Sequence, residues 1–297
     1  MFVKTRAQLR RLLVDFSKGV TTPLTCRLLG RPQAPEVPES LHLLLSAKTW
    51  DFGVLAALSF EHSTGRRWPI VVHEDGTITP DQRKTIEHFL ECRFVTRAEA
   101  DAVAEQRLAN HPLSLDQRRS HVFMLKFFDL EPFAPKERFV YLDSDIIFYR
   151  EAREVIDWQA SGRHECWFNE DTRETYCSPR EEIEAEMGVS LWRAVNAGFC
   201  LVTKRALSLD LTERLLTTFQ GRARHPQFYE QTLWALNASH FGQGGLLPRT
   251  YEISWGLLKR PGCICRHYVG PPAKDILYIE GTHSLLAQAL LKKLRLA

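Results

Sequence analysis

Short apolar segments alternate with segments typical of helices over the first 150 residues, and this alternation constrains the fold more than any other feature of the sequence. Thr79 and Pro80 mark one helix start, because threonine is a good N-cap and proline is tolerated at the first helical position. Strands separated by helices in this way pair in parallel, with helices on both faces of the sheet. We therefore expect an α/β fold built on a mostly parallel sheet. The expected strands are 41–45, 68–73, 93–96 and 139–142, and the expected helices are 51–62, 79–91, 98–109 and 114–130, the last with Ser114 and Gln117 as a capping box.

The rest of the chain is less regular. Residues 20–40 are rich in proline, so we expect residues 1–40 to form a short helix and a linker before a main domain at 41–285. Residues 286–297 form a basic amphipathic tail. Its cations either complement the dipole of a terminal helix or bring the tail into contact with anionic lipid. The cations are Lys292, Lys293 and Arg295, and further strands are expected at 165–168, 199–203 and 251–254, with helices at 179–187, 207–219 and 227–239.

The composition excludes several classes of protein. Lys and Arg number 39 against 36 Asp and Glu, and a net charge of +3 is too small to predict a nucleic-acid partner. No apolar run approaches the roughly 18 residues that a membrane-spanning helix needs. The seven cysteines are an odd set and the N-terminus lacks a secretory signal, so we expect a cytoplasmic protein with reduced thiols. Cys263 and Cys265 lack a second pair of metal ligands and are expected to be packed thiols.

The segment 138–148 places two carboxylates, Asp143 and Asp145, between core-forming residues. Ligands of an open α/β sheet bind at the carboxyl ends of its strands, and alternate residues of a strand point the same way. Both carboxylates can therefore share one cation, and oxygen ligands suit Mg²⁺ or Mn²⁺. A simple turn is the other interpretation, although acids flanked by apolar residues are costly to bury without a cation.

A second segment, 266–274, contains His267, Gly270 and Lys274. A histidine can add a nitrogen ligand to a metal site. A glycine lets the backbone approach a phosphate closely, and a lysine supplies a point charge for the same phosphate. The alternative is a surface loop in which these residues have no common role.

Together the two segments resemble the retaining glycosyltransferases of family 8, over roughly residues 41–285. In that family Y-L-D-x-D holds Mn²⁺, and a late H-x-x-G-x-x-K motif supplies the third metal ligand and a diphosphate-binding lysine. The resemblance implies the GT-A fold and Mn²⁺ (or Mg²⁺) held by Asp143, Asp145 and His267. It also implies that Gly270 and Lys274 bind the donor, with Lys274 one residue later than the motif places it.

Other segments match the family in the same order along the chain. The resemblance implies that Glu230 accepts a hydrogen bond from the donor sugar and that the Gln231 amide oxygen lies beneath the anomeric carbon. It places the N-A-G segment that begins at Asn196 beside the donor sugar. Further donor-binding residues implied in this way are Lys126, Ser144 and Ala197.

Two positions depart from the family. Glu252 stands where the L-P-x-x-Y-N turn usually has asparagine, and Ser46 to Trp50 replace the usual nucleoside contact after the first strand. We expect uracil or ribose contacts at Ser46 and Lys48. Trp50 either stacks on the base or belongs to the core.

These residues predict a metal-dependent glycosyltransferase that moves a hexose from a nucleotide-diphosphate sugar, expected to be a UDP-sugar, with retention. The acceptor, whether carbohydrate, lipid-linked or protein, stays open, as does a peripheral position at the inner face of the membrane through the tail. An inverting enzyme of the same fold would need a carboxylate base, for which Glu170, Asp171 or Glu230 could serve. A sugar-phosphate nucleotidyltransferase would need a phosphate loop after the first strand, and an inactive nucleotide-sugar-binding scaffold would lack a metal ligand.

Overall fold

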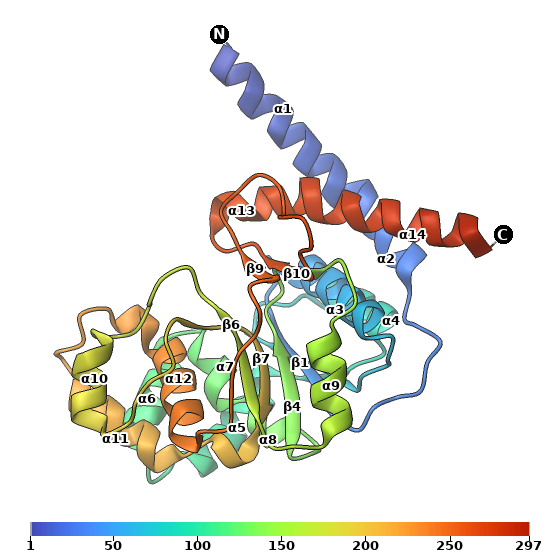
Figure 1. Ribbon diagram of the computed structural model, residues 1–297. Helices are drawn as coiled ribbons and strands as arrows, with labels where there is room; N and C mark the ends of the chain where they lie inside the picture. Colours follow the sequence, from blue (N-terminus) through green and yellow to red (C-terminus); the bar gives the residue numbers. More distant parts are fainter. Residues whose placement is uncertain (1, 297) are drawn as a thin grey trace.

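The computed structural model describes residues 2–296. Its largest element is a seven-stranded sheet (Figure 1). In spatial order the strands are β3 (Arg93–Val95), β2 (Ile70–Glu74), β1 (Ser40–Leu45), β4 (Arg138–Leu142), β7 (Val195–Thr203), β6 (Cys166–Glu170) and β8 (Gly244–Leu246). The first four are parallel, β7 runs antiparallel to β4 and β6, and β6 pairs with β8 in parallel. The predicted α/β fold with a mostly parallel sheet is confirmed.

A smaller sheet continues from the end of β4. It consists of β5 (Ile146–Phe148), β10 (Cys265–His267) and β9 (Tyr251–Ile253), in that order. β10 pairs antiparallel with β5, and the register sets His267 opposite Ile146. Because Ile146 follows Asp145 directly, this register brings the histidine beside the carboxylates that end β4.

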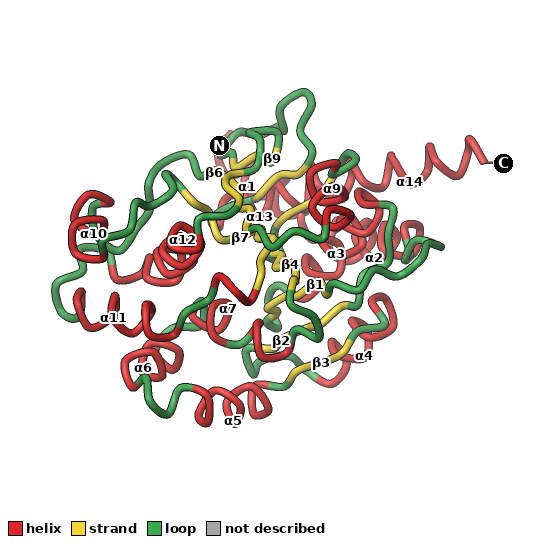
Figure 2. Tube along the Cα trace, turned by 60° about the horizontal axis from the view of Figure 1, so that its bottom comes forward, coloured by secondary structure: helices red, strands yellow, loops and turns green. Residues whose placement is uncertain are grey.

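Alternate residues of β4 face opposite sides of the large sheet, as the strand geometry requires. Val140 and Leu142 belong to a core that includes residues of β1 and of helix α3 (Trp50–Thr64). Phe139 and Tyr141 belong to a second core with residues of helix α12 (Tyr229–Phe241). Figure 2 shows the strands running between these two groups of helices. The sheet therefore presents only its strand ends to ligands.

The remaining helices of the main body include one region that differs from its prediction. The single helix expected over 114–130 is wrong, because the chain forms three short helices there. The first begins at Pro112, and the Leu113 and Ser114 N–H groups donate to the Glu213 carboxylate at 2.8 Å each. A carboxylate from another helix thus replaces the local cap that Ser114 and Gln117 were expected to form. The three short helices are α6 (Pro112–Ser120), α7 (Met124–Phe128) and α8 (Leu130–Phe133). The other remaining helices of the main body are α4 (Pro80–Leu90), α5 (Arg97–Arg107), α9 (Arg153–Ser161), α10 (Arg180–Met187) and α11 (Leu209–Phe219).

The two ends of the chain form long helices that pack together away from the large sheet (Figure 1). At the N-terminal end α1 (Phe2–Phe16), a π turn (Ser17–Thr21) and α2 (Thr22–Leu29) follow without a break. At the C-terminal end α13 (Pro271–Ile276), a π turn (Leu277–Gly281) and α14 (Thr282–Leu296) do the same. The expected linker at 20–40 therefore starts only after Leu29, since Pro23 stands in the first turn of α2, where its missing N–H costs little. Residue 286, the expected start of the tail, lies inside α14, and residue 297 and the Arg295 side chain lie outside the part described.

All seven cysteines are free, and the Cys263 thiol donates to the carbonyl oxygen of Cys265 at 3.1 Å. Both residues are buried, which agrees with the expectation of packed thiols. Among residues 2–296, no helix combines the length and the apolarity needed to cross a bilayer.

Candidate functional site

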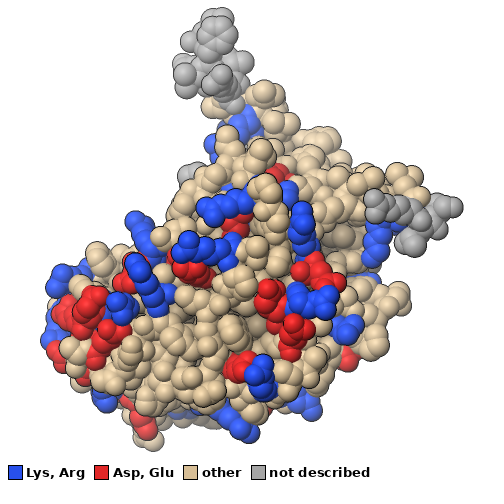
Figure 3. Space-filling model, in the orientation of Figure 1, with Lys and Arg blue, Asp and Glu red and all other residues tan. Residues whose placement is uncertain are grey.

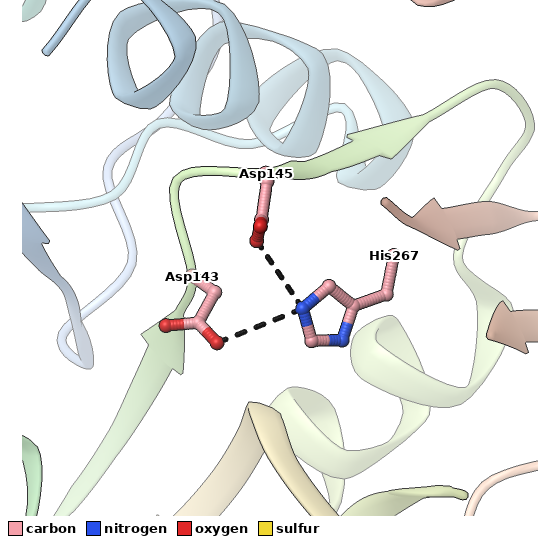
Figure 4. A group of neighbouring side chains, drawn as sticks. All are labelled: Asp143, Asp145 and His267. Carbon is pink, nitrogen blue, oxygen red and sulfur yellow. Dashed lines mark ion pairs between the residues drawn. The ribbon is translucent and has the colours of Figure 1, made fainter. Parts of the chain in front are cut away.

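Three potential metal ligands meet where β4 passes into β5 (Figure 4). Asp143 and Asp145 lie in the turn between these strands, and His267 comes from β10. His267 Nε2 lies 3.2 Å from Asp145 Oδ1 and 3.7 Å from Asp143 Oδ2. One ligand atom from each residue lies within 4.8 Å of the others. The predicted grouping of two carboxylates and an imidazole is confirmed, and the identity of the ion stays a prediction.

The N-A-G segment on β7 holds the histidine in place. His267 Nδ1 lies 3.1 Å from Asn196 Oδ1, so the proton on Nδ1 is donated to the amide and Nε2 is left to face the carboxylates. Asn196 in turn donates to Asp171 Oδ2 at 3.0 Å. A Cβ on Gly198 would lie 2.3 Å from His267 Cε1. Glycine is therefore required at this position because the imidazole packs directly against the backbone.

Two lysines balance the charge of the buried carboxylates. Lys126 Nζ lies 3.4 Å from Asp143 Oδ1 and 3.6 Å from Glu230 Oε1. Lys274 Nζ lies 3.7 Å from Asp145 Oδ2, so the extra residue before this lysine does not remove it from the site. Burial alone would lower the pKa of Lys126, but the carboxylates of Asp143 and Glu230 outweigh burial and the pKa is raised. This ammonium therefore stays charged at physiological pH.

Two further pKa shifts follow from the same surroundings. Burial raises the pKa of Glu230 to about 7, although the Lys126 ammonium acts in the opposite direction. Burial also works to lower the pKa of His267, but the Asp145 carboxylate outweighs it and the pKa is raised. The site therefore contains a carboxyl that can change its protonation state near neutral pH, next to a group of fixed charges.

The cluster opens into a cavity of about 660 Å³. Twelve of the residues predicted to bind the donor or the metal or to act in catalysis line it, on six different segments of the chain. These residues are Ser46, Lys126, Asp143, Ser144, Asp145, Asn196, Ala197, Glu230, Gln231, His267, Gly270 and Lys274. Lys48 and Trp50 do not line it: Lys48 is exposed, and Trp50 packs against the core. Trp50 therefore takes the second of its two expected roles, and the functions of the lining residues stay predictions.

The first turn of α12 supplies the two predicted catalytic side chains. Glu230 is buried beside Lys126, and the Gln231 Nε2 group donates to the Thr175 carbonyl oxygen at 2.9 Å. The second contact of Nε2 is the Thr175 hydroxyl. These bonds fix the amide plane, and no described residue donates to its oxygen. Gln231 Oε1 is therefore left as an acceptor for a ligand.

Sequence reasoning missed several residues that line the same cavity. Asp75 follows β2, which is the parallel neighbour of β1, and the rule that strand ends share one edge would have found it. Phe123 lies in the turn before α7, inside the region where one continuous helix was expected, and Trp255 lies in an irregular segment without a periodic pattern. Of the acids considered as a base, Asp171 lines the cavity, whereas Glu170 pairs with Arg249 outside it at 2.8 Å.

Comparison with known proteins places the fold. No family model matches the chain, and no curated protein matches its sequence. The solved galactosyltransferase LgtC, in complex with donor and acceptor sugar analogs, matches 84% of this chain and 95% of its own at 14% identity, with a TM-score of 0.54. The glycosyltransferase GlyE of Streptococcus pneumoniae matches 86% of this chain and 64% of its own at 12% identity, with a TM-score of 0.51. The fold is that of the GT-A glycosyltransferases.

The GT-A fold agrees with the position of the cluster at the end of β4. At this level of identity the likeness concerns the fold, so membership of family 8 stays a prediction. The site residues are supported by their own geometry in this chain: three converging ligands, two lysines and a fixed amide around one cavity.

Proposed function

We propose that the protein is a metal-dependent glycosyltransferase that moves a hexose from a nucleotide-diphosphate sugar, with a UDP-sugar as the expected donor, to an acceptor. The observation that carries the proposal is the convergence of Asp143, Asp145 and His267 with Lys126 and Lys274 in one cavity. Two carboxylates and two lysines around a common point suit a diphosphate that is bound through a cation. The reaction breaks the bond between the anomeric carbon and the diphosphate and forms a bond to an acceptor hydroxyl.

The residues present fit Mn²⁺, with Mg²⁺ as the second candidate. Two carboxylates and one imidazole form a mixed oxygen and nitrogen donor set, which suits a transition metal better than Ca²⁺. When bound, such an ion supplies Lewis-acid neutralisation of the charge that develops on the leaving diphosphate. Asp143, Asp145 and His267 would hold it.

The protein's own groups act on the same charge and on the sugar. Lys274 and Lys126 add fixed positive charge near the leaving group. Gly270 has φ +83°, which glycine adopts at little cost, and it lines the cavity, so its backbone is open to the diphosphate. Glu230, in its ionised form, accepts a hydrogen bond from a sugar hydroxyl, and the Gln231 oxygen stabilises positive charge at the anomeric carbon.

We propose retention of the anomeric configuration, supported by the surroundings of the candidate bases. Glu170 is held by Arg249 outside the cavity, and Asp171 accepts hydrogen bonds from Asn196 and Thr172. Glu230 pairs with Lys126. Among the described residues no donor reaches Gln231 Oε1, which is polar and not basic and lies on the same helix turn as Glu230. These surroundings disfavour an inverting mechanism.

A nucleotidyltransferase and an inactive scaffold fit the site less well. The turn after β1 contains Ser46 and Thr49, whose hydroxyls bond each other at 3.0 Å, and it lacks the glycine- and basic-rich loop of a nucleotidyltransferase. An inactive scaffold would lack part of the metal cluster, whereas all three ligands converge here.

The test is a screen of nucleotide sugars for donor hydrolysis with Mn²⁺, Mg²⁺, Ca²⁺ or excess chelator. We expect one donor class to be hydrolysed, faster with Mn²⁺ than with Ca²⁺ and not at all in chelator. A thermal-shift series with nucleotide diphosphates identifies the nucleobase through ligand-linked stabilisation. Undiminished turnover in chelator would remove the metal from the proposal.

We also propose peripheral contact with the inner face of an anionic membrane through the chain ends. Lys292 and Lys293 of the tail lie on α14, and Figure 3 shows basic side chains next to both grey ends. Residues 2–29 and 282–297 together contain nine Lys and Arg and one acid, whereas the whole chain has a net charge of +3. A helix with basic and apolar faces is typical of binding at a lipid surface.

The N-terminal helices strengthen this proposal. Their exposed large apolar side chains recur at helical spacing and form one stripe, consisting of Leu9, Leu12, Leu13, Phe16, Val20 and Leu24. Sedimentation with vesicles of anionic and of neutral lipid tests the contact. We expect binding to the anionic vesicles only, and a loss of binding in Leu12→Ser/Phe16→Ser. Equal binding to both vesicle types would exclude electrostatic attraction to anionic lipid as a cause of the membrane contact.

A further inference from the structure

The loop between β9 and β10 exposes three large apolar side chains, the first of which lines the cavity. Trp255, Leu257 and Leu258 are 60%, 78% and 75% exposed, respectively. Trp255 lines the cavity, and a carbon of its ring lies 3.4 Å from where a Cβ on Gly270 would be. Figure 2 shows the chain projecting from the body beside β9. Clustered apolar side chains of this size in contact with water usually mark a binding surface.

A buried ion-pair network holds the base of this loop. The Arg266 guanidinium, which is fully buried, donates to Glu280 Oε2 at 2.6 Å and to the carbonyl oxygens of Ser254 and Gly256. Glu280 Oε1 also accepts the backbone N–H of Lys259 at 2.6 Å. The backbone on both sides of the exposed leucines is therefore tied to the body of the protein.

Glu252, which stands where the family 8 turn usually has asparagine, also helps to hold the base of this loop. Its Oε2 accepts the backbone N–H of Arg260 at 2.9 Å. Lys259 adds a bond from Nζ to the Ser284 hydroxyl at 3.0 Å, which joins the loop to the first turn of α14. A loop fixed at so many backbone positions presents its apolar side chains in a defined place, and it has little freedom to fold over the donor as a lid.

We propose that residues 254–260 are the acceptor platform, and that the acceptor carries an apolar group attached to the sugar that receives the hexose. This inference rests on the proposed glycosyltransferase function and names the acceptor class for that same site. The metal side of the cavity offers carboxylates, an imidazole and lysines, which suit the diphosphate. Trp255 stands on the cavity wall, where an indole packs against the apolar face of a sugar ring.

Leu257 and Leu258 lie further along the loop and offer no side-chain hydrogen bonds. A ligand made only of sugar hydroxyls gains little from them, whereas an alkyl or isoprenoid chain buries apolar area against them. The ligand that fits this order, indole and then leucines, is a saccharide with a lipid chain at its reducing end. The apolar group then lies outside the cavity while the acceptor hydroxyl points inward.

The experiment compares pairs of acceptors that share a sugar and differ in the aglycone. Octyl and methyl glycosides of glucose, galactose and mannose are assayed below the micelle concentration, with Mn²⁺ and the donor found by the hydrolysis screen. We expect a KM at least tenfold lower for the octyl member of the accepted pair. In Leu257→Ser/Leu258→Ser that preference falls severalfold, while the KM for the methyl glycoside and the rate of donor hydrolysis stay unchanged. The matched control is Leu257→Met/Leu258→Met, which keeps an apolar side chain at both exposed positions and therefore leaves the preference intact.

Binding is measured in parallel, so that the proposal is tested even when no sugar of the set is turned over. Calorimetric titration of the protein loaded with nucleotide diphosphate should show octyl glycosides binding and methyl glycosides binding at least tenfold more weakly. Equal affinity for both overturns the acceptor platform and leaves the glycosyltransferase proposal standing. A loss of donor hydrolysis in the double variant would assign the loop to the donor and also overturn it. A wild-type protein that hydrolyses no nucleotide sugar would instead contradict the proposed function itself.

Discussion

The metal side and the rim of the cavity are held in place by different kinds of interaction. On the metal side, the register between β5 and β10 fixes His267 against Asp145, and the strand ends carry the ligands. On the rim, the loop 254–260 has no strand partner and is held by Arg266 and Glu280. The register of paired strands fixes the positions of the metal ligands. A loop held through its backbone by a side-chain network can carry different exposed side chains without loss of that network. The first arrangement suits chemistry, and the second suits selection of an acceptor.

The largest effect is expected on the metal side. Asp143→Ala or Asp145→Ala should lower transfer and donor hydrolysis by about 10³-fold, because each change removes a ligand and its charge from the developing diphosphate. The protein should stay folded, since the turn that carries both residues lies outside the two cores. Initial rates at limiting Mn²⁺ and thermal unfolding measure the two properties. Glu170→Gln, an acid paired outside the cavity, is the control, and full activity in either alanine variant would remove the metal assignment.

A methyl group added beside His267 tests whether metal binding depends on the position that the register between β5 and β10 gives this histidine. Gly198→Ala would place a Cβ 2.3 Å from His267 Cε1, so the imidazole must move away from the carboxylates. We expect Mn²⁺ to bind about 10–100-fold more weakly, the range seen when a supporting group of a ligand is lost. Titration followed by the electron paramagnetic resonance of free Mn²⁺ measures this. Gly245→Ala is the matched control, because its Cβ would meet only the Trp167 ring at 3.5 Å, and equal losses in both variants would show that the site does not depend on this contact.

The amide of Gln231 should affect catalysis less than the metal ligands. We expect Gln231→Ala to lower kcat about tenfold with a smaller change in donor KM, because the amide oxygen acts mainly in the transition state. The product formed from an α-linked nucleotide sugar should be α-linked, as read from its anomeric proton by NMR. Gln227→Ala, a glutamine on the same cavity wall, is the control. A β-linked product would move the protein to the inverting class and leave Gln231 as an ordinary helix residue.

The same contrast explains how much the sequence could predict. Asp143 and Asp145 were predictable because ligands bind at the carboxyl ends of the strands of a parallel sheet, and His267 was predictable from the resemblance of its segment to a family motif. The β-strands were predicted within a few residues, apart from β5, β8 and β10. These three strands pair with partners that are distant in the sequence, although β3 and β9, which are equally short, were predicted.

The rim could not be predicted, for a physical reason. The positions of Trp255, Leu257 and Leu258 depend on Arg266 and Glu280, which bond to backbone atoms and leave no periodic pattern in the loop. The same holds for α6, whose first turn is capped by the carboxylate of Glu213 about a hundred residues later. In both places a charged side chain from elsewhere in the chain satisfies backbone groups and overrides the local propensity.

The last effect is on stability and not on activity, and it concerns two histidines in the interior of the large sheet, whose surroundings are the reverse of those of His267. His42 Nδ1 lies 2.9 Å from His73 Nε2, and Ser40 Oγ lies 2.8 Å from His42 Nε2. No carboxylate takes part in this chain of hydrogen bonds, and His73 Nδ1 is buried without a partner. Burial therefore lowers the pKa of His73 to about 3, with a further contribution from Arg93, and burial next to His73 lowers the pKa of His42 as well.

Since both pKa values are lowered on folding, the unfolded chain binds these protons more readily than the folded one. The stability that the neutral pair contributes is complete above the unfolded value of about 6.5 and is lost as the pH falls towards the folded values. Between pH 7.5 and 5.5 the loss should reach about 1.4 kcal/mol for each histidine. In His42→Leu/His73→Leu the difference in unfolding free energy between these two pH values should shrink by about twice that amount. The exposed His88→Gln serves as the control, and denaturant unfolding at both pH values is the measurement. An unchanged pH dependence in the double variant would mean that the two buried rings already take up their protons in the folded protein, through a partner or a water that their present contacts do not include.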